Sequence, residues 1–480
     1  QAIDRNKFDE LFLHQLMFAR SRAEATRRPA YSVKRDYDSE KTFADSFPFE
    51  LTKAQKRSVD EILSDMSDPH PMNRLLEGDV GSGKSAVAAA AIESCLRSGH
   101  QAAYLAPTEI LAKQQWTELS EMLPEHSVAL LTRSEILLSQ LVGVELQTET
   151  SSLRSTVKKL LRSGEIQFVV ATHALLQEGY EFDKLGLLVI DEQHRFGVRQ
   201  RQELMSRAGK IAPHLLSMSA TPIPRSLALS IYGDLDISIL DELPAGRKPI
   251  KTHLVSDKNM SSAINLIERE IESKHQVYAV CPLIDPSDKL GAKSVTEFAD
   301  ELRSGQLGKY RIEILHGKLK PADKSEVIKQ FVAGEIDILV STTVVEVGVN
   351  VPNATIMFIE GAERFGLAQL HQLRGRVGRA DIESYCILHP NSFSDRSRDR
   401  LVAMTESQDG FALAERDLEL RGSGNLFGTA QSGFIDFKLA TLADVDLMKK
   451  ARDWAGKINV EDYPDLEDKV EQQYEQVHFE

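Results

Sequence analysis

The stretch Gly78-Asp79-Val80-Gly81-Ser82-Gly83-Lys84-Ser85 decides how the rest of the chain is interpreted. It matches the pattern G-x-x-x-x-G-K-[ST], in which glycines let the backbone curl until its N–H groups point at phosphate oxygens. Residues 72–76 predict a short strand before it, and the alanine-rich residues 86–92 predict a helix after it. This context favours a nucleotide site over a plain glycine turn, because a phosphate loop must follow a strand and open a helix.

Five positions in this loop have separate predicted roles. Gly78, Gly81 and Gly83 are expected to shape the backbone around the phosphates. The ammonium group of Lys84 is expected to neutralise the β- and γ-phosphates, and the hydroxyl of Ser85 is expected to hold a Mg²⁺ ion. The sequence therefore predicts a site for a nucleotide triphosphate with its metal.

Strand and helix patterns alternate regularly after the loop. Residues 185–190 form a continuous apolar run of the kind that is buried on both faces in a parallel sheet. Residues 135–164 are mostly polar and are expected to be helical. The alternation predicts a doubly wound α/β domain, in which ligands bind at the carboxyl ends of the strands. Further strands are expected at residues 102–105, 127–132 and 167–172.

Two acidic residues, Asp191 and Glu192, follow the apolar strand directly. At the tip of a strand, Asp191 can reach the Mg²⁺ ion held by Ser85. Glu192 can orient and deprotonate a water molecule for in-line attack on the γ-phosphate. The alternative is a pair of surface carboxylates, but the α/β pattern shared with the phosphate loop favours a metal and base site.

A boundary is predicted at residues 243–249, which combine two prolines, a glycine and charged side chains. The alternation then starts again without a second glycine-rich phosphate loop. The sequence therefore predicts a second α/β domain that lacks its own nucleotide cradle. Its strands are expected at residues 277–282, 312–315, 336–340 and 356–359.

The second domain carries Arg374, Arg376 and Arg379, which are separated by glycines. Glycines are unusual in a structural helix, where each costs about 1 kcal/mol relative to alanine. An arginine that reaches across a cleft can stabilise the charge that spreads over transferring phosphate oxygens. We therefore expect Arg376 and Arg379 to complete the site from the second domain. For Arg374, contact with the phosphates of a nucleic acid is the alternative.

The residues before the loop predict a helix, a linker and part of a base-binding site. Residues 7–28 have an apolar face and are expected to be helical, whereas the polar residues 31–46 are expected to form a linker. Thr52 is a predicted N-cap. The amide of Gln55 can pair with the edge of adenine, and the ring of Phe49 can stack on it.

Composition limits the remaining possibilities. The chain has 480 residues, which suggests two or three domains, and its net charge of −14 would repel a polyanion. Any binding of nucleic acid must therefore come from local basic patches. Cys95, Cys281 and Cys386 are far apart, so neither a disulfide framework nor a zinc site is indicated, and a reducing, cytosolic setting is expected. No apolar run is long enough to predict a membrane span.

Taken in order, these blocks resemble the helicases and translocases of superfamily 2, in which two RecA-like domains share one ATP. The resemblance covers residues 47–390 and includes Pro-Thr-Glu at 107–109, Asp-Glu-Gln-His at 191–194 and Ser-Ala-Thr at 219–221. It also includes Thr-Thr-Val-Val-Glu-Val-Gly-Val at 342–349. The resemblance implies coupling or DNA contacts for Thr108, Thr172, His194, Ser219 and Thr221, and a nucleotide contact for Gly348.

Within the superfamily, the chain resembles the RecG family. Residues 416–433, Arg-Asp-Leu-Glu-Leu-Arg-Gly-Ser-Gly-Asn-Leu-Phe-Gly-Thr-Ala-Gln-Ser-Gly, are similar to the translocation motif that this family shares with the transcription-repair coupling factor. Residues 172–179 and 365–371 resemble the same family, and Gln193 favours it over the coupling factor. The resemblance implies that three side chains report on the ATP cycle: Arg416, Arg421 and Gln431.

The resemblance implies an ATP- and Mg²⁺-dependent helicase that remodels branched double-stranded DNA in recombination and repair. It also implies a monomer in the cytoplasm, associated with the nucleoid and not with membranes, that contacts single-strand-binding protein. The wedge domain of the family is expected to be absent from this chain, and Asn350 stands where an aspartate is usual. The alternatives are a duplex translocase of the transcription-coupled type and a DNA-binding scaffold that binds ATP without turnover.

The predicted organisation has four parts. An N-terminal helix and linker occupy residues 1–46, and the first RecA-like domain occupies residues 47–245. The second RecA-like domain occupies residues 246–392. Residues 393–480 are expected to form a helical region with the translocation motif, which ends in an acidic tail.

Overall fold

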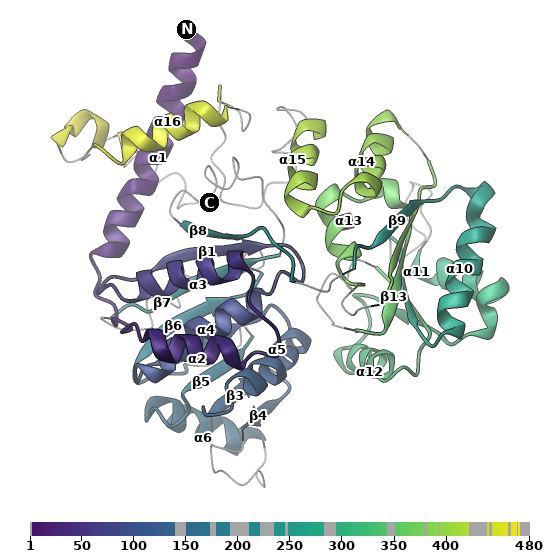
Figure 1. The fold of residues 1–480 in the computed structure, drawn as a ribbon, viewed down its shortest axis with the longest axis horizontal. Helices are drawn as coiled ribbons and strands as arrows, with labels where there is room; N and C mark the ends of the chain where they lie inside the picture. The colour runs from purple at the N-terminus through teal and green to yellow at the C-terminus, as the bar shows by residue number, and fades with distance from the viewer. Residues whose placement is uncertain are drawn as a thin grey trace.

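The computed structural model of the chain describes residues 2–139, 150–172, 179–192, 211–220, 235–244, 248–282, 294–342, 351–378, 382–392, 394–421, 439–440, 444–458, 462–467 and 469–470. These residues form two α/β lobes, each built on one sheet (Figure 1). We call the lobe of the eight-stranded sheet the first lobe and that of the six-stranded sheet the second lobe. The architecture confirms the prediction of two tandem, doubly wound, RecA-like α/β domains.

The sheet of the first lobe has the strand order β4-β3-β5-β2-β6-β7-β1-β8. All neighbouring strands are parallel except β3 and β4, which form an antiparallel edge. Parallel neighbours require crossover connections, and helices provide them. The strands are β1 (Asn73–Gly78), β2 (Gln101–Leu105), β3 (Val128–Leu131), β4 (Ile136–Leu138), β5 (Phe168–Ala171), β6 (Leu185–Ile190), β7 (His214–Ser219) and β8 (Asp236–Leu240).

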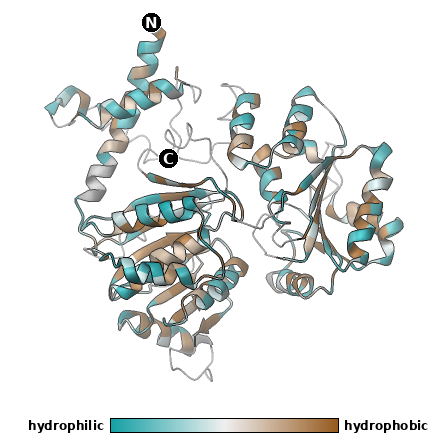
Figure 2. Ribbon diagram, viewed as in Figure 1, coloured by the Kyte–Doolittle hydropathy of each residue, from teal (hydrophilic) through white to brown (hydrophobic). Residues whose placement is uncertain are grey.

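Helix α4 lies at the centre of the first lobe. Its small and apolar side chains, including Ala88, Ala89 and Ile92, are fully buried. Figure 2 shows α4 mostly in the hydrophobic half of the scale, whereas α2 and α3 are mostly hydrophilic. The side chains of α4 thus join the apolar core that positions the start of this helix at the carboxyl edge of the sheet. The helices of this lobe are α2 (Tyr37–Ser46), α3 (Lys53–Met66), α4 (Lys84–Arg97), α5 (Glu109–Met122) and α6 (Thr150–Arg162).

The sheet of the second lobe is entirely parallel, in the order β11-β12-β10-β13-β14-β9. Its strands are β9 (Lys251–Leu254), β10 (Gln276–Val280), β11 (Ile312–Leu315), β12 (Ile338–Ser341), β13 (Ala354–Glu360) and β14 (Tyr385–His389). Its helices are α10 (Met260–Glu272), α11 (Val295–Ser304), α12 (Pro321–Val332), α13 (Leu367–Arg374), α14 (Asp395–Glu406) and α15 (Gly410–Arg421), with short 3₁₀ turns at Asp257–Asn259, Gln306–Lys309 and Ala362–Arg364.

Two helices from opposite ends of the chain, α1 (Ala2–Thr26) and α16 (Val445–Ala455), cross and pack together (Figure 1). Leu11 and Met448 are buried between them, and the Lys7 ammonium group donates to Asp444 at 2.9 Å. The carboxylate of Glu10 accepts from the backbone N–H of Ala440 at 2.8 Å. Residues of α1 therefore bind the C-terminal segment. Among the helices of the described ranges, none has the length and apolar character that crossing a bilayer requires.

The elements predicted from the sequence differ from the structure in a few places. Strands β6 and β11 have the predicted bounds, and Thr52 caps α3 as predicted. The expected linker at 31–46 is wrong in part, because residues 37–46 form α2, whose N-terminus is capped by Asp36. The expected helix at 135–164 is also wrong in part, because β4 precedes α6 and pairs with β3. The sequence analysis did not predict β8, β9 or β14.

Candidate functional site

The phosphate loop joins β1 to α4 and has a conformation that requires glycine. Gly81 and Gly83 have φ values of +77° and +83°, in the left-handed region. A Cβ atom at Gly83 would lie 2.2 Å from Nε2 of Gln55, so space also excludes a side chain there. That Nε2 atom donates to the carbonyl of Ser82 at 2.8 Å. Gln55 therefore attaches α3 to the loop.

The first backbone N–H groups of α4 take no part in the hydrogen bonds of the helix in the described part of the chain. In the described part of the chain, those of Gly83, Lys84 and Ser85 donate to no backbone carbonyl, whereas those of Ala86 and Val87 donate to the carbonyl of Gly83. These groups lie at the positive end of the dipole of a 14-residue helix. The arrangement fits the oxygens of a bound phosphate.

The side chain of Lys84 lies within the loop. Its Nζ atom donates to the carbonyl of Gly78 at 2.8 Å and to that of Asp79 at 2.9 Å. Burial lowers the pKa of this ammonium group, although the carboxylates of Glu192 and Asp191 oppose the shift. A cation with few protein ligands in a low-dielectric site attracts an anion strongly. Lys84 therefore suits the phosphate role predicted for it.

The acidic pair lies at the carboxyl end of β6. Burial, together with the charge of Glu192 and against the charge of Lys84, raises the pKa of Asp191 to about 6. Asp191 Oδ1 accepts from the backbone N–H of Glu192 at 2.9 Å. Glu192 has a φ of +50°, which is rare for a residue with a Cβ atom and costs on the order of 1–3 kcal/mol. Strain of this kind is concentrated at functional sites, so the backbone conformation supports the predicted role of Glu192 as a base.

The oxygen donors around Ser85 and Asp191 fit a magnesium ion. Mg²⁺ prefers hard oxygen ligands and keeps several waters, so one hydroxyl and one carboxylate can hold it beside a phosphate. Ser85 Oγ lies 3.4 Å from the amide oxygen of Gln115, a long contact that another ligand can replace. Across the described ranges, no cluster of three or more His, Cys, Asp or Glu side chains could form an all-protein metal cage. The donor set therefore fits a metal that arrives with a nucleotide.

The second lobe approaches the phosphate loop through the turn that follows α13. Arg376 in this turn is 5% exposed, and its charge contributes to the lowered pKa of Lys84 after burial. A Cβ atom at Gly375 would lie 2.8 Å from Cβ of Val80 in the loop. The guanidinium group of Arg376 therefore lies within electrostatic reach of Lys84, as the prediction of a site completed across the lobes requires.

A direct contact between the lobes was not predicted from the sequence. His371 on α13 places its Nε2 atom 2.5 Å from Oδ1 of Asp79, a residue of the phosphate loop. Burial on its own would raise the pKa of Asp79, but the hydrogen bond and charge of His371, the N–H of Val80 and the charge of Lys84 together outweigh it, and the pKa lies below its usual value. The only signal in the sequence was the charge of Asp79, at a position where the phosphate-loop pattern allows any residue. That signal does not predict which residue Asp79 contacts.

The predicted DNA contact of Arg374 is wrong for this structure. Its side chain is 1% exposed, so it offers no surface to a nucleic acid. Its Nη1 atom donates to the carbonyls of Met404 at 2.9 Å and Ser407 at 2.8 Å. Three arginines in one block look alike in sequence, but Arg374 lies on α13 under α14 and therefore connects α13 to the end of α14 and the segment that follows it.

The two residues predicted to bind adenine differ in their surroundings. Phe49 is 43% exposed and stacks on Phe47, with ring centroids 5.4 Å apart. Gln55 is 1% exposed, and its Oε1 atom accepts from the backbone N–H of Thr52 at 2.8 Å, as part of the cap of α3. The adenine contacts of both side chains stay predictions.

The residues predicted to couple ATP to DNA lie at the ends of elements. Thr108 caps α5, Thr172 follows β5, and Ser219 ends β7 at the same edge of the sheet as the acidic pair. Arg416 lies on α15 and pairs with Glu419 at 2.8 Å. Five predicted site residues lie outside the described ranges, as does the side chain of Arg421; the five are His194, Thr221, Gly348, Arg379 and Gln431.

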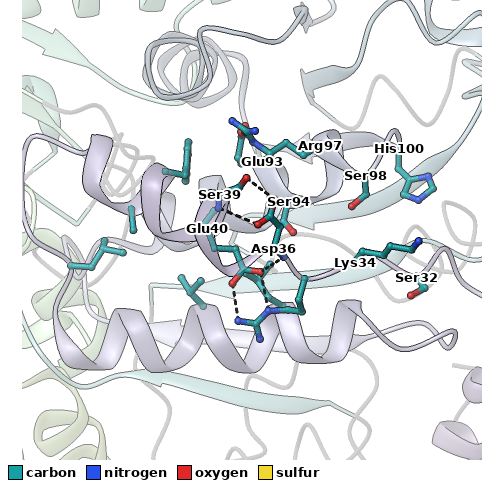
Figure 3. A pocket seen from close by; sticks show the side chains of 17 residues that line it. Ser32, Lys34, Asp36, Ser39, Glu40, Glu93, Ser94, Arg97, Ser98 and His100 are labelled. Atoms are coloured by element: carbon teal, nitrogen blue, oxygen red, sulfur yellow. Dashed lines mark hydrogen bonds and ion pairs between the residues drawn. The ribbon is translucent and has the colours of Figure 1, made fainter.

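A cavity of about 470 Å³ lies between α2, α3, the C-terminal half of α4 and residues 32–36 (Figure 3). Its floor is apolar, with Phe43 and Leu63 among the lining residues. Two pairs of charged groups that line it neutralise each other, because Arg35 binds Glu40 at 2.8 Å and Arg97 binds Glu93. The cavity lies at the end of α4 opposite to the phosphate loop.

Three family models match the chain in sequence. The DEAD/DEAH box helicase model matches residues 52–229, and the helicase conserved C-terminal domain matches residues 258–381. The third model, the C-terminal part of domain 3 of ATP-dependent DNA helicase RecG, matches residues 407–476. The first two matches correspond to the two lobes, and the third includes α15 and α16.

Curated relatives named ATP-dependent DNA helicase RecG match nearly the whole chain. The relative from Synechocystis is 47% identical over 98% of this chain and 56% of its own length. The relative from Streptococcus pneumoniae is 45% identical, with 96% and 66% covered. For the relative from Staphylococcus epidermidis strain RP62A the identity is 42%, with 98% and 68% covered. The chain thus spans between about half and two thirds of the length of these relatives.

Solved structures give the same result. A structure of RecG bound to a three-way DNA junction matches with a TM-score of 0.78 at 38% identity, covering 95% of this chain and 57% of that one. The DUF1998 helicase MrfA, bound to DNA and AMPPNP, matches with a TM-score of 0.55 at 18% identity, covering 79% of this chain and 54% of that one. The second likeness shows the fold alone.

Proposed function

We propose that this chain, which belongs to the RecG family, hydrolyses ATP in the cleft between its lobes and uses the resulting lobe motion to remodel branched duplex DNA. One observation carries the proposal. Arg376 of the second lobe lies within electrostatic reach of Lys84 in the phosphate loop of the first. A nucleotide at the loop would therefore contact both lobes. Its hydrolysis would change the interactions that hold the two lobes together.

Each residue at the cleft has a role that its surroundings support. The N–H groups at the start of α4 and the ammonium group of Lys84 bind the phosphates. Glu192, held in a left-handed conformation, orients a water molecule and takes its proton. Arg376 neutralises the charge that develops on the transferring oxygens, an effect worth about 10³ to 10⁵ in rate in related sites. Arg379 is proposed to assist it.

The remaining contacts complete the proposal. Ser85 and Asp191 would hold Mg²⁺, which neutralises charge on the phosphates when it is bound. Gln55 and Phe49 would recognise adenine, and Gly348 would contact the nucleotide from the second lobe. The residues proposed to couple the cleft to DNA are Thr108, Thr172, His194, Ser219, Thr221, Arg416, Arg421 and Gln431.

We propose the partners and organisation of this chain by analogy with its family. One solved RecG is described as bound to a three-way DNA junction, and we propose a branched substrate for this chain as well. Action as a monomer in the cytoplasm, near the nucleoid and in contact with single-strand-binding protein, belongs to the same proposal. The division into four parts at residues 46, 245 and 392 is proposed with it.

The proposal is tested by ATP hydrolysis measured with fork DNA, with linear duplex DNA and without DNA. We expect stimulation that is larger for the fork. A scaffold that binds ATP without turnover would show no stimulation, and a translocase of the transcription-coupled type would show no preference for the fork.

The Glu192→Gln variant should bind ATP as the parent does and lose turnover by a factor on the order of 10². The matched control is Glu50→Gln, because the side chain of Glu50 is 88% exposed and pairs with Lys56. Undiminished hydrolysis by Glu192→Gln would remove the base assignment.

A further inference from the structure

The contact between the phosphate loop and α13 is close and polar. Nε2 of His371 lies 2.5 Å from Oδ1 of Asp79, and the backbone at Gly375 passes Val80 with no space for a Cβ atom. Two independent positions thus bring the same two segments together. We call the four residues Asp79, Val80, His371 and Gly375 the interlobe contact.

The hydrogen bond has a defined direction because of Arg374. A guanidinium group has only donors, and its Nη2 atom lies 2.9 Å from Nδ1 of His371, so Nδ1 must be the acceptor. The proton of the ring is therefore on Nε2, and the ring donates it to the carboxylate of Asp79. Arg374 thus fixes both the tautomer and the orientation of the ring.

Asp79 connects this bond to the interior of the phosphate loop. Its carboxylate also accepts from the backbone N–H of Val80 at 2.6 Å. Its backbone carbonyl accepts from Nζ of Lys84 at 2.9 Å and from the N–H of Ser82 at 3.1 Å. A shift of His371 would therefore move the residue that holds the phosphate-binding lysine and shapes the loop.

Arg374 connects His371 to the helices that follow the second sheet. Arg374, which holds His371, donates to the carbonyls of Met404 on α14 and Ser407 between α14 and α15. The side chain of Gln408 in the same segment donates to the carbonyl of Ile250, beside β9. The ring of His371 is therefore positioned by the second lobe and not by the loop that it contacts.

We propose that His371 is a positioning residue for ATP turnover, which holds Asp79 and the phosphate loop in register with the Arg376 turn when the lobes meet. This inference rests on the proposed function and adds a residue to it. Because the contact lies between the lobes and not on the nucleotide, its loss should reduce the rate of hydrolysis and leave binding nearly unchanged. Displacement of reacting groups by about 1 Å can cost on the order of 10²-fold in rate.

The test measures fork-stimulated ATP hydrolysis and equilibrium binding of ATP for variants of both partners. His371→Phe keeps a ring but removes the donor, so kcat should fall at least about tenfold, with a change in Kd below about threefold. His371→Gln returns an N–H near the position of Nε2 and should recover most of the rate. Asp79→Ala should reproduce the defect from the first lobe, whereas Asp79→Asn, which keeps the acceptor, should lose less of the rate than Asp79→Ala.

Two controls separate positioning from folding. His275→Phe removes a similar bond, from Nδ1 to Glu270 at 2.9 Å, that lies wholly within the second lobe, and it should leave hydrolysis unchanged. The double variant His371→Phe with Asp79→Ala should be no slower than the slower single variant, because both remove one interaction. If His371→Phe fails to fold, Asp79→Ala compared with Asp79→Asn decides the question alone.

The inference is overturned if His371→Phe or Asp79→Ala hydrolyses ATP at the parental rate. It is also overturned if the two losses multiply in the double variant, or if His371→Gln is as slow as His371→Phe. These results leave the proposed function intact as long as the parent shows fork-stimulated hydrolysis. Absence of hydrolysis by the parent overturns both.

Discussion

The two lobes arrange their strands in the same order. If the six parallel strands of each sheet are numbered along the chain, leaving out β4 and the edge strand β8, both sheets have the order three, four, two, five, six, one. In this numbering β1 corresponds to β9, β6 to β13 and β7 to β14. The lobes are therefore two versions of one fold, and the differences between them show what the nucleotide site requires.

The correspondence extends to a buried side chain. Gln101 at the start of β2 donates from Nε2 to the carbonyls of Leu161 and Ile166, at 2.9 and 2.7 Å. Gln276 at the start of β10 donates in the same way to the carbonyls of Phe331 and Ile336, at 2.6 and 2.8 Å. In both lobes the amide satisfies carbonyls where a helix ends and leads into the next strand.

The lobes differ at the carboxyl edge of the sheet. In the first lobe β1 leads into the phosphate loop and β6 into the acidic pair. At the corresponding places the second lobe has Asp257, after β9, and Glu360, at the end of β13. His389 ends β14 and lies between them, with Nδ1 2.7 Å from Glu360 and Nε2 3.0 Å from Asp257.

At the carboxyl edge of the second sheet, this histidine binds both acidic side chains. Both ring nitrogens face carboxyl oxygens, an arrangement that favours the doubly protonated, positively charged ring. Burial on its own would lower the pKa of His389, but the hydrogen bonds and charges of Glu360 and Asp257 together outweigh it and raise the pKa. The acids of the second lobe thus bind a histidine of the same lobe, whereas Asp191 and Glu192 of the first lobe lie near the charge of Lys84 in the phosphate loop.

Among the changes that compare the two lobes, the largest expected effect is the loss of turnover when the phosphate loop is changed. Lys84→Ala should reduce fork-stimulated ATP hydrolysis by a factor on the order of 10² to 10³, because the phosphate charge loses its buried partner. The matched change in the second lobe is Lys258→Ala, in the turn that follows β9. It should have no effect, and equal losses for the two variants would mean that both edges bind nucleotide.

A smaller effect distinguishes the two glutamines. Oε1 of Gln101 also accepts from the N–H groups of Asp183 and Lys184, at 2.8 and 3.1 Å, whereas Oε1 of Gln276 accepts no hydrogen bond from the residues that the structure describes. At about 1 kcal/mol for each bond, Gln101→Leu should lower the free energy of unfolding by about 4 kcal/mol and Gln276→Leu by about 2 kcal/mol. Denaturant titration of the two variants measures both losses in free energy of unfolding. A larger loss for Gln276→Leu than for Gln101→Leu would contradict this prediction.

The smallest effect depends on pH. Because the pKa of His389 is raised in the folded protein, its stabilisation is fully present below the unfolded value of about 6.5 and is lost as the pH rises through the folded value. Near pH 6, His389→Gln should be less stable by about 2 kcal/mol, and the difference should shrink at higher pH. Unfolding measured across this range tests the point, and a difference that grows with pH would contradict the charge assignment.

The sequence predicted the parts of the fold whose residues carry a local signal. The apolar run of β6 and the glycines of the phosphate loop are of this kind. Strand β9 escaped prediction because its residues are alternately exposed and half-buried, and α2 because its surface is polar. Local pattern could not separate Arg374 from Arg376, because burial under α14 is a tertiary property.

The contact between Asp79 and His371 is a clearer example of a feature that local sequence pattern cannot predict. The residues are 292 positions apart, and their meeting depends on how the two lobes face each other. Neither side chain departs from an ordinary pattern in its own segment. The site within one lobe could therefore be predicted from its motif, while the contact that joins the lobes required the structure.

The central claim is that one nucleotide site, in the first lobe, is completed by an arginine from the second. The most direct test is the Arg376→Ala variant, with fork-stimulated ATP hydrolysis and the equilibrium Kd for ATP measured on the same preparation. Turnover should fall by a factor on the order of 10³, while Kd changes by less than about threefold. Hydrolysis at the parental rate would show that the second lobe does not take part in the chemistry.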